Sequence, residues 1–210
     1  CCFCVNQWRV REMQERGDKI SFEAFEKTFS ERVTQIQNVL ALLTPWDDPG
    51  NLKRLWCVFE LHFAIKEPHC SLNLLLPAEE YERFERQLVE SSGKSVLGGM
   101  SSVWGVMERL RVQEAQARYE DDRVNILRII APGLSLGNSE EEQQALAKAC
   151  TTHNDVIKKE LQDWFVSQSM ESLKHGCGQS SQAHCAIAYM LVNLSKYDMA
   201  LQVLSSAASL

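Results

Sequence analysis

The chain has 210 residues, 45% of them hydrophobic and 24% charged, which is ordinary for a globular protein. Its formal charge of −6 comes from 28 acidic and 22 basic residues without a basic block, so a nucleic-acid partner is not expected. No run approaches the ~18 apolar residues that span a membrane, so no membrane partner is expected either.

Three short apolar runs predict buried strands in the first ninety residues. They are CCFCV at 1–5, VLALL at 39–43 and SLNLLL at 71–76. None alternates with polar residues, which is typical of strands that are covered on both faces. Because the chain opens at Cys1 within such a run and without a charged leader, we expect it to begin inside a structural element, with the first strand truncated.

Helical patterns separate these runs. Ser21 is placed to cap a helix whose phenylalanines recur at helical spacing, and Asn51 is placed to cap a second helix over 52–66. A third helix is predicted to begin at Pro77, beside acidic residues that suit a first turn. The alternating order of strands and helices predicts an α/β domain with a parallel sheet over residues 1–90.

The loops that follow the strands are the places where a ligand is expected. In parallel sheets of this kind, ligands bind in the crevice beyond the carboxyl ends of the strands. The candidate ligand-binding loops are therefore residues 6–20, 44–51 and 76–79.

A break rich in glycine and serine follows at 91–102. It contains Gly93-Lys94-Ser95, which suggests comparison with a phosphate-binding loop. Such a loop needs a glycine five positions before Gly93, where this chain has Leu88, and no strand precedes the segment. We therefore interpret residues 91–102 as a linker.

Residues 103–175 predict an all-helical connector. Apolar residues at helical spacing predict one helix that ends at Pro132-Gly133 and another that begins at Ser139 with an acidic first turn. The charged run YEDDR at 119–123 is interpreted as a solvated face of the first of these helices, with docking on the α/β domain as the alternative.

The last segment, 183–210, is predicted to form two short helices and resembles one tetratricopeptide repeat (TPR). The packing positions of that family fall on these residues: Ile187, Ala188, Leu191, Tyr197, Ala200, Leu204 and Ala207. His184 stands where the family often has Trp, and Ser195 stands where it often has Gly. Because a single repeat cannot bury its own face, the resemblance implies further repeats beyond Leu210 and protein partners bound through them.

The helix at 52–66 carries one carboxylate, Glu60, in an otherwise apolar stretch. Its apolar side chains occur on nearly every side, so we expect it to pack between the sheet and other elements. Burying an ionised Glu costs several kcal/mol unless the carboxylate is paired or reaches water. Two interpretations follow. Glu60 pairs with Arg54, Lys53 or the preceding loop as a structural acid, or it opens onto a cleft that binds a ligand.

The sequence LKRLWCVFEL at 52–61 resembles the S-x-x-W-C-x-x-E-L helix of TIR (Toll/interleukin receptor) domains. The match lies on Trp56, Cys57, Glu60 and Leu61. The flanking sequences VLALLTP and CSLNLLLP resemble the neighbouring strands of that family, although Leu52 or Lys53 stands where the family tends to have Ser. Over about residues 1–88 the resemblance implies a TIR/flavodoxin-like fold.

The same resemblance implies a possible activity. In TIR domains that cleave NAD, the Glu of this motif is the catalytic acid, and that role carries over to Glu60 alone. A carboxylate there can hold the ribose hydroxyls of NAD+ and stabilise the oxocarbenium-like charge that forms as nicotinamide leaves. Other TIR-like domains act only by assembling with one another, and Trp56, Cys57 and Leu61 are expected to be motif residues that pack in either case.

The other histidines and cysteines are predicted to have structural roles rather than redox, catalytic or metal-binding roles. Cys1 and Cys4 have redox spacing but lie within the first apolar run, so a buried strand is favoured. His62 is two residues from Glu60, so the two side chains point apart on a helix and a Glu–His dyad is disfavoured. No metal site is predicted, because the spacing of four candidate zinc ligands fits no common set: His175, Cys177, His184 and Cys185.

The main functional prediction is an intracellular signalling or scaffold protein that combines TIR-type self-association with binding of other proteins through TPR-like repeats. The alternative is an NAD+ hydrolase (NAD glycohydrolase) that uses Glu60 as its catalytic acid, with NAD+ as substrate and no bound cofactor. Both predictions place the protein in the cytoplasm, because its eight cysteines lack the spacing of a disulfide framework and are interpreted as mostly reduced.

Overall fold

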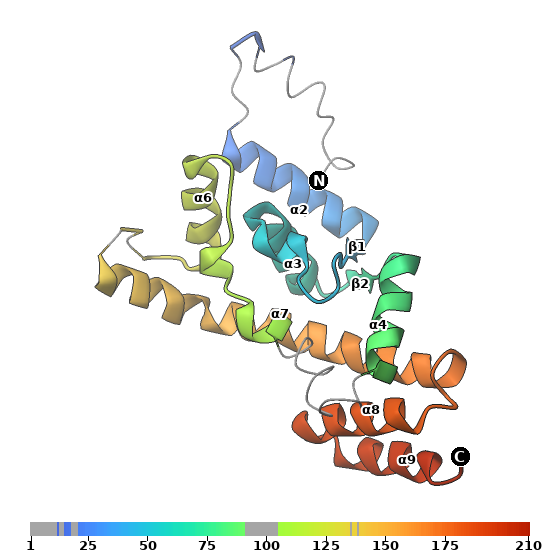
Figure 1. The fold of residues 1–210 in the computed structure, drawn as a ribbon. Helices are drawn as coiled ribbons and strands as arrows, with labels where there is room; N and C mark the ends of the chain where they lie inside the picture. Colours follow the sequence, from blue (N-terminus) through green and yellow to red (C-terminus); the bar gives the residue numbers. More distant parts are fainter. Residues whose placement is uncertain (1–11, 13–14, 18–20, 91–104, 135, 138) are drawn as a thin grey trace. The chain divides into compact units, whose positions relative to one another are not determined.

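The computed structural model describes residues 12, 15–17, 21–90, 105–134, 136–137 and 139–210, and Figure 1 shows their fold. The described chain is mostly helical, with a small two-stranded parallel sheet. The strand predicted at 1–5, most of the 6–20 loop and the linker at 91–102 lie outside the described residues. Among the helices of the described part, none combines the length and the apolar character needed to cross a membrane.

The chain divides into two compact units that interleave along the sequence. The described residues of unit 1 fall within 1–41, 50–75 and 111–155, and those of unit 2 fall within 42–49, 76–110 and 156–210. The domain boundaries predicted from the sequence are consecutive, whereas each unit is assembled from three separate segments. The long helix α7 (Glu140–His175) contributes its first part to unit 1 and its second part to unit 2.

Strands β1 (Asn38–Leu42) and β2 (Ser71–Leu75) pair with each other and lie where two of the apolar runs predict strands. The sequence predicts a sheet that is covered on both faces. Instead, exposure alternates along β1, and Leu40 and Leu42 are 64% and 56% exposed. Within the described residues, one face of the sheet is therefore open, because a short apolar run does not by itself specify which of its faces is covered.

Helices α2 (Phe22–Ile36) and α3 (Leu55–Lys66) provide the aromatic core of unit 1. Ser21 caps α2, because its hydroxyl accepts a hydrogen bond from the Ala24 N–H at 3.2 Å. The short 3-10 turn η1 (Gly50–Lys53) leads into α3. Rings from both helices pack with centroids 4.7 to 6.0 Å apart and form the aromatic cluster: Phe22, Phe25, Phe29, Trp56, Phe59 and Phe63.

The helix predicted to run up to Pro132-Gly133 is interrupted in the structure. A 3-10 turn, η2 (Val112–Glu114), and an extended Gln116 come before helix α6 (Glu120–Ile130). Gln116 pairs with Arg54 in a parallel bridge, in which the Leu55 N–H donates to the Gln116 carbonyl at 2.9 Å. Backbone bonds to a distant segment thus override the helical spacing of the local sequence.

Unit 2 is helical, with helix α4 (Ala78–Glu90) and the second part of α7. Its core contains three rings that are each nearly inaccessible to solvent: Trp46, Phe84 and Phe165. The Trp46 ring meets the other two edge to face, with centroids 5.1 and 6.1 Å apart. These rings bring the loop after β1 together with α4 and α7.

Helices α8 (Ser181–Asn193) and α9 (Tyr197–Ala207) form a hairpin where the sequence predicts two short helices. The residue between them, Ser195, has a φ of 58°, in the left-handed region that glycine adopts without strain. This is the position at which the TPR resemblance leads one to expect Gly.

Candidate functional site

Trp56 of the TIR-like motif is held by three elements of unit 1. Its ring packs against Phe22 and Phe25 of α2, with centroids 5.7 and 4.7 Å away. Its indole N–H donates to the Asp122 carboxylate of α6 at 3.0 Å. The charged run 119–123 therefore docks on α3 through Asp122 rather than serving only as a solvated face. Asp122 also lies in the acidic first turn of α6, where the helix dipole favours a negative charge.

Leu61 and Cys57 differ in their surroundings. Leu61 is buried, with 4% of its surface exposed, and contributes to the core of unit 1. Cys57 is half-buried and is a free thiol. Burial raises the pKa of the Cys57 thiol, and the nearby Glu60 carboxylate raises it further. At neutral pH this cysteine is therefore a protonated thiol and a poor nucleophile.

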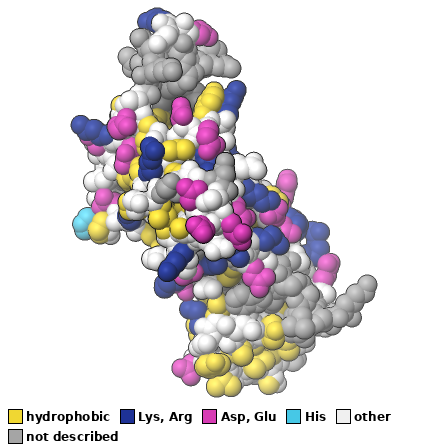
Figure 2. Space-filling view, turned by 90° about the vertical axis from the view of Figure 1, so that its left-hand side faces the viewer, with side chains coloured by type: hydrophobic (Ala, Val, Ile, Leu, Met, Phe, Trp, Pro, Cys, Tyr) yellow, Lys and Arg dark blue, Asp and Glu magenta, His cyan; other side chains and the backbone are white. Residues whose placement is uncertain are grey.

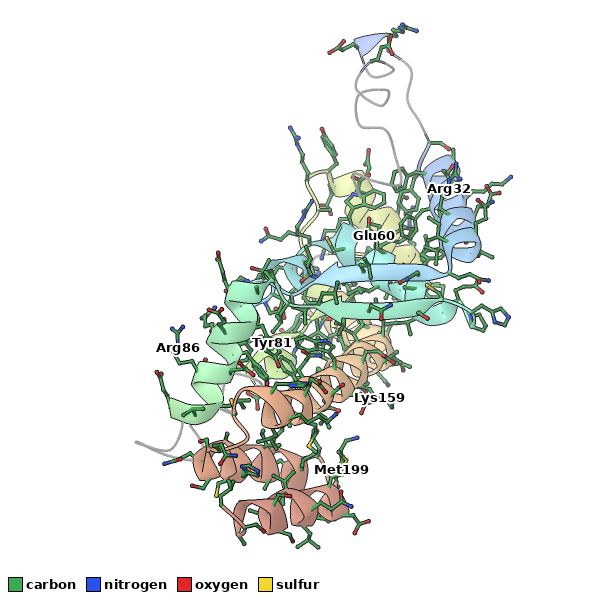
Figure 3. The ribbon with its side chains drawn as sticks, turned by 90° about the vertical axis from the view of Figure 1, so that its right-hand side faces the viewer. Arg32, Glu60, Tyr81, Arg86, Lys159 and Met199 are labelled. Atoms are coloured by element: carbon green, nitrogen blue, oxygen red, sulfur yellow. The ribbon has the colours of Figure 1, made fainter. Side chains whose placement is uncertain are left out.

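Glu60, which is labelled in Figure 3, lies on α3. It comes four residues after Trp56 in the sequence and so shares the side of the helix that carries Trp56. The side chain is half-buried, in a helix whose other central residues are mostly apolar. Its carboxylate is close enough to the Cys57 thiol to act on that thiol's pKa. A half-buried carboxylate on the side of the helix that carries the motif Trp can accept hydrogen bonds from a polyhydroxylated ligand or from a neighbouring side chain.

His62, also on α3, is bonded to a residue that sequence reasoning missed. Its Nδ1 lies 3.1 Å from Nδ1 of His153, which is on α7. Burial lowers the pKa of His62 to about 3, with a smaller contribution from His153, and lowers the pKa of His153 to about 4. The two histidines are 91 positions apart in the sequence, which leaves no local pattern that could have indicated the pair.

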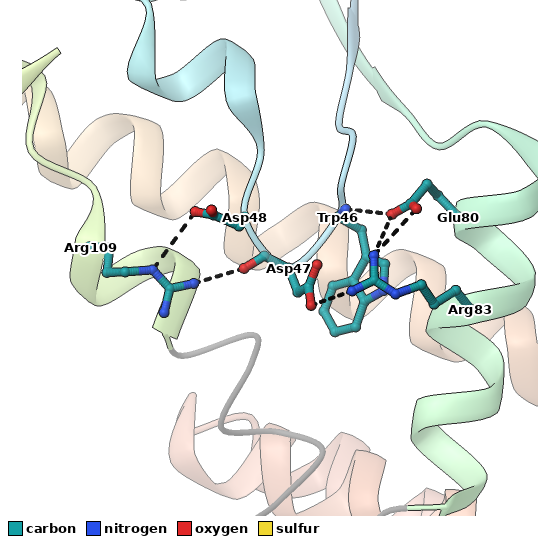
Figure 4. Close-up of polar contacts among 6 residues, drawn as sticks. All are labelled: Trp46, Asp47, Asp48, Glu80, Arg83 and Arg109. Carbon is teal, nitrogen blue, oxygen red and sulfur yellow. Dashed lines mark hydrogen bonds and ion pairs between the residues drawn. The ribbon is translucent and has the colours of Figure 1, made fainter. Parts of the chain in front are cut away.

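A second polar cluster lies in unit 2, at the 44–51 loop that follows β1 (Figure 4). The Trp46 backbone N–H donates to Glu80 Oε2 at 2.7 Å, and Arg83 donates to both oxygens of Glu80 at 3.3 and 3.2 Å. Arg83 also donates to Asp47 Oδ2 at 2.5 Å. The 44–51 loop is thus linked to Glu80 and Arg83 of α4. Helix α4 begins at Ala78, so residues 78 and 79 of the predicted ligand-binding loop 76–79 belong to its first turn.

Arg109 completes this cluster from the described helical stretch at 105–109. Its guanidinium donates to the Asp47 carbonyl at 2.7 Å and lies 4.0 Å from an Asp48 carboxylate oxygen. The side chains of the charged pairs are between 18% and 59% exposed, so water screens the charges and each pair contributes little to stability. The cluster fixes the conformation of the loop without presenting an arrangement that identifies a reaction.

The four residues considered as zinc ligands each have other surroundings. His175 pairs with Glu171 at 2.8 Å, and the His184 ring is 2.9 Å from the Ser180 carbonyl. Cys177 is buried, whereas Cys185 is exposed. Within the part of the chain that the structure describes, no three histidine, cysteine or acidic residues are grouped so as to hold a metal ion.

Comparison with known proteins adds no relative. No protein-family model matches the chain, and neither the curated proteins nor the solved structures contain a match.

Proposed function

We propose that the protein is a protein–protein interaction component of a signalling or scaffold assembly, built from a TIR-like part and a TPR-like hairpin. The observation that supports this most is the outer side of α9. Ala200 and Val203 of α9 are buried, whereas Leu201 and Leu204 on the same helix are 64% and 43% exposed. A helix that is apolar on both sides is suited to packing between two neighbours.

The exposed apolar residues on the α8–α9 hairpin form a patch, which we call the hairpin patch: Val192, Tyr197, Leu201 and Leu204. Figure 2 shows hydrophobic side chains gathered at the end of the view where this hairpin lies. No charged residue occurs in α9 after Asp198, so around Leu201 and Leu204 water is displaced without desolvating a charge on this helix. An exposed apolar patch of this kind is typical of a surface that binds protein.

The TIR-like part of the proposal is supported by the order of elements in residues 38–90. A strand, a polar loop, the Trp56 helix, a second strand parallel to the first and another helix follow one another. The motif residues Trp56 and Leu61 contribute to the packing of α3, as they would in a TIR-type assembly module.

Two substitutions on α9 test the interaction. Leu201→Asp places a charge in the hairpin patch, and Gln202→Asp places the same charge on the adjacent exposed residue. We expect the wild type and Gln202→Asp to self-associate or retain the same protein partners in affinity capture, and Leu201→Asp to lose them. A protein that stays monomeric in sedimentation at all concentrations, and whose captured partners are unaffected by Leu201→Asp, contradicts the proposal.

The setting of Glu60 favours a second candidate function, hydrolysis of NAD+ to nicotinamide and ADP-ribose. Its half-buried carboxylate lies on the Trp56 side of an otherwise apolar helix. In this reaction the bond between the ribose and nicotinamide breaks and nicotinamide leaves with the electron pair. Water adds to the ribose carbon and releases one proton to the solvent. The Glu60 carboxylate would stabilise the positive charge that develops on the ribose.

Release of nicotinamide from NAD+, followed by chromatography, tests this second function. We expect turnover to fall by about two orders of magnitude or more in Glu60→Gln, because a carboxylate that stabilises transition-state charge is lost. Glu82→Gln, which changes an exposed acid on α4, is the matched control. Turnover that is absent in the wild type, or unchanged in Glu60→Gln, rules the activity out.

A further inference from the structure

The His62–His153 pair joins two helices of unit 1 that are far apart in the sequence. His62 is 4% exposed, and the two Nδ1 atoms are 3.1 Å apart. The ring centroids are 4.7 Å apart, and His62 also meets the Phe63 ring edge to face. The polar contact between α3 and α7 therefore involves a ring, that of His62, which is almost entirely removed from water.

A nitrogen–nitrogen hydrogen bond requires one donor and one acceptor, so the two rings share a single proton between their Nδ1 atoms. His153 Nε2 is buried and has no hydrogen-bond partner among the residues that the structure describes. A hydrogen on that atom would be an orphaned donor, which costs more than an unpaired acceptor. We therefore assign the shared proton to His153 Nδ1, which donates to His62.

Among the described residues, no acidic side chain contributes to the pKa of either ring, so added positive charge is not compensated there. On α3, Lys66 acts on both rings, and its charge disfavours their protonation. On α7, the flanking side chains are neutral: Cys150 is a fully buried thiol, and Asn154 is buried and accepts a hydrogen bond from a backbone N–H. Helix α6, which packs against α3, buries only apolar residues: Ile126, Leu127 and Ile130.

From this geometry we infer that the His62–His153 pair is an acid-sensitive latch, which holds α3 against α7 while both rings are neutral and releases α3 when they take up protons. A first added proton places a charge in an apolar site beside Lys66. A second makes both Nδ1 atoms donors that face each other, so the bond can no longer form. Because α3 also carries Glu60, release of α3 would change which groups surround that carboxylate.

The direction of the pH dependence follows from linkage. The pKa values of about 3 and 4 in the folded state are below the ordinary value of 6.5, so the open state binds more protons in the range between them. The free energy that keeps the latch closed is therefore fully present above about pH 6.5. It decreases as the pH falls towards the folded-state pKa values. Each proton taken up on opening changes the opening equilibrium by up to about tenfold per pH unit.

Two buried cysteines report on the latch. Cys150 lies one helical turn before His153 and is 0% exposed, whereas Cys177 is 4% exposed and belongs to unit 2. The full chain is labelled with dithiodipyridine, which reacts with thiols in acid, and each cysteine is followed by peptide mass spectrometry. Between pH 7.5 and pH 5 we expect labelling of Cys150 to accelerate about tenfold or more relative to labelling of Cys177.

Three variants identify the groups responsible. In His153→Gln the relative acceleration should become smaller, because only His62 remains to take up a proton, and in His69→Gln, which changes an exposed histidine, it should be kept in full. Lys66→Met changes an exposed side chain and so keeps the fold. It should leave the onset of the acceleration near pH 6.5, which the open state sets, and reduce its size in stronger acid, because the folded-state pKa values rise when one opposing charge is gone. Parallel changes at Cys150 and Cys177 in the wild type, or an acceleration in His153→Gln as large as in the wild type, overturn the latch.

Discussion

Two tryptophans, one in each unit, show how differently the same side chain can be accommodated. Trp56 of unit 1 is half-buried, and its indole N–H is bonded to Asp122. Trp46 of unit 2 is 1% exposed, and within the described part of the chain its indole N–H has no hydrogen-bond partner. The Trp46 backbone N–H, by contrast, is bonded to Glu80.

The difference separates two sources of stability. Trp46 contributes through the area that it buries against Phe84 and Phe165, and an unpaired polar atom reduces that contribution. Trp56 buries less of its surface, but none of its stabilising free energy is offset by an unpaired polar atom. Its hydrogen bond to a carboxylate is of the stronger, charge-assisted kind. Burial alone therefore does not rank the two residues.

The largest effect that we predict is the loss of the Trp46 ring. Trp46→Ala should lower the free energy of unfolding by about 3–5 kcal/mol, because the cavity left among buried rings can collapse only in part. Denaturant unfolding followed by circular dichroism measures the change. Trp164→Ala, on the same core helix as Phe165, is a useful comparison because Trp164 is only half-buried. An equal loss in the two variants would contradict the importance of burial in this core.

Much of the local structure could be predicted from the sequence, because short-range rules decide it. Ser21 caps α2 as its position suggests, and strands β1 and β2 lie at the two apolar runs. The interruption before α6 could not be predicted, since it arises from the pairing of Gln116 with Arg54 across a long sequence separation. Hydrophobic spacing contains no information on such a partner.

The candidate site was predictable to a similar extent. The motif on α3 and the loop at 44–51 stand out because a lone acid in an apolar helix and a polar loop after a strand are local features. Their partners do not stand out. His153 and Arg83 become relevant only through contacts that the folded chain makes. Asp122 was partly predictable from the sequence, because docking of the charged run at 119–123 was one of its two interpretations.

Phenylalanine substitutions sharpen the comparison of the two tryptophans. Trp56→Phe removes the bond to Asp122 and should cost about 1–2 kcal/mol. Trp46→Phe also removes ring area, but it eliminates the unpaired N–H, so its cost should stay within about 1 kcal/mol. The ranking would then be opposite to the ranking by burial. If Trp46→Phe is clearly the more destabilising of the two, the unpaired N–H has no energetic importance.

The smallest predicted effect concerns the charged contacts around the Trp46 loop. The Asp47 and Arg83 side chains are 26% and 42% exposed, so solvent screens their attraction, and Asp47→Ala should cost about 0.5 kcal/mol at low salt. At 1 M salt the screening length falls to about 3 Å, and most of that difference should vanish. Unfolding of the wild type and the variant at the two salt concentrations gives the comparison. A cost that persists at high salt would show that Asp47 holds the loop through its hydrogen bond rather than through its charge, and would make the loop a more important part of unit 2 than its exposure indicates.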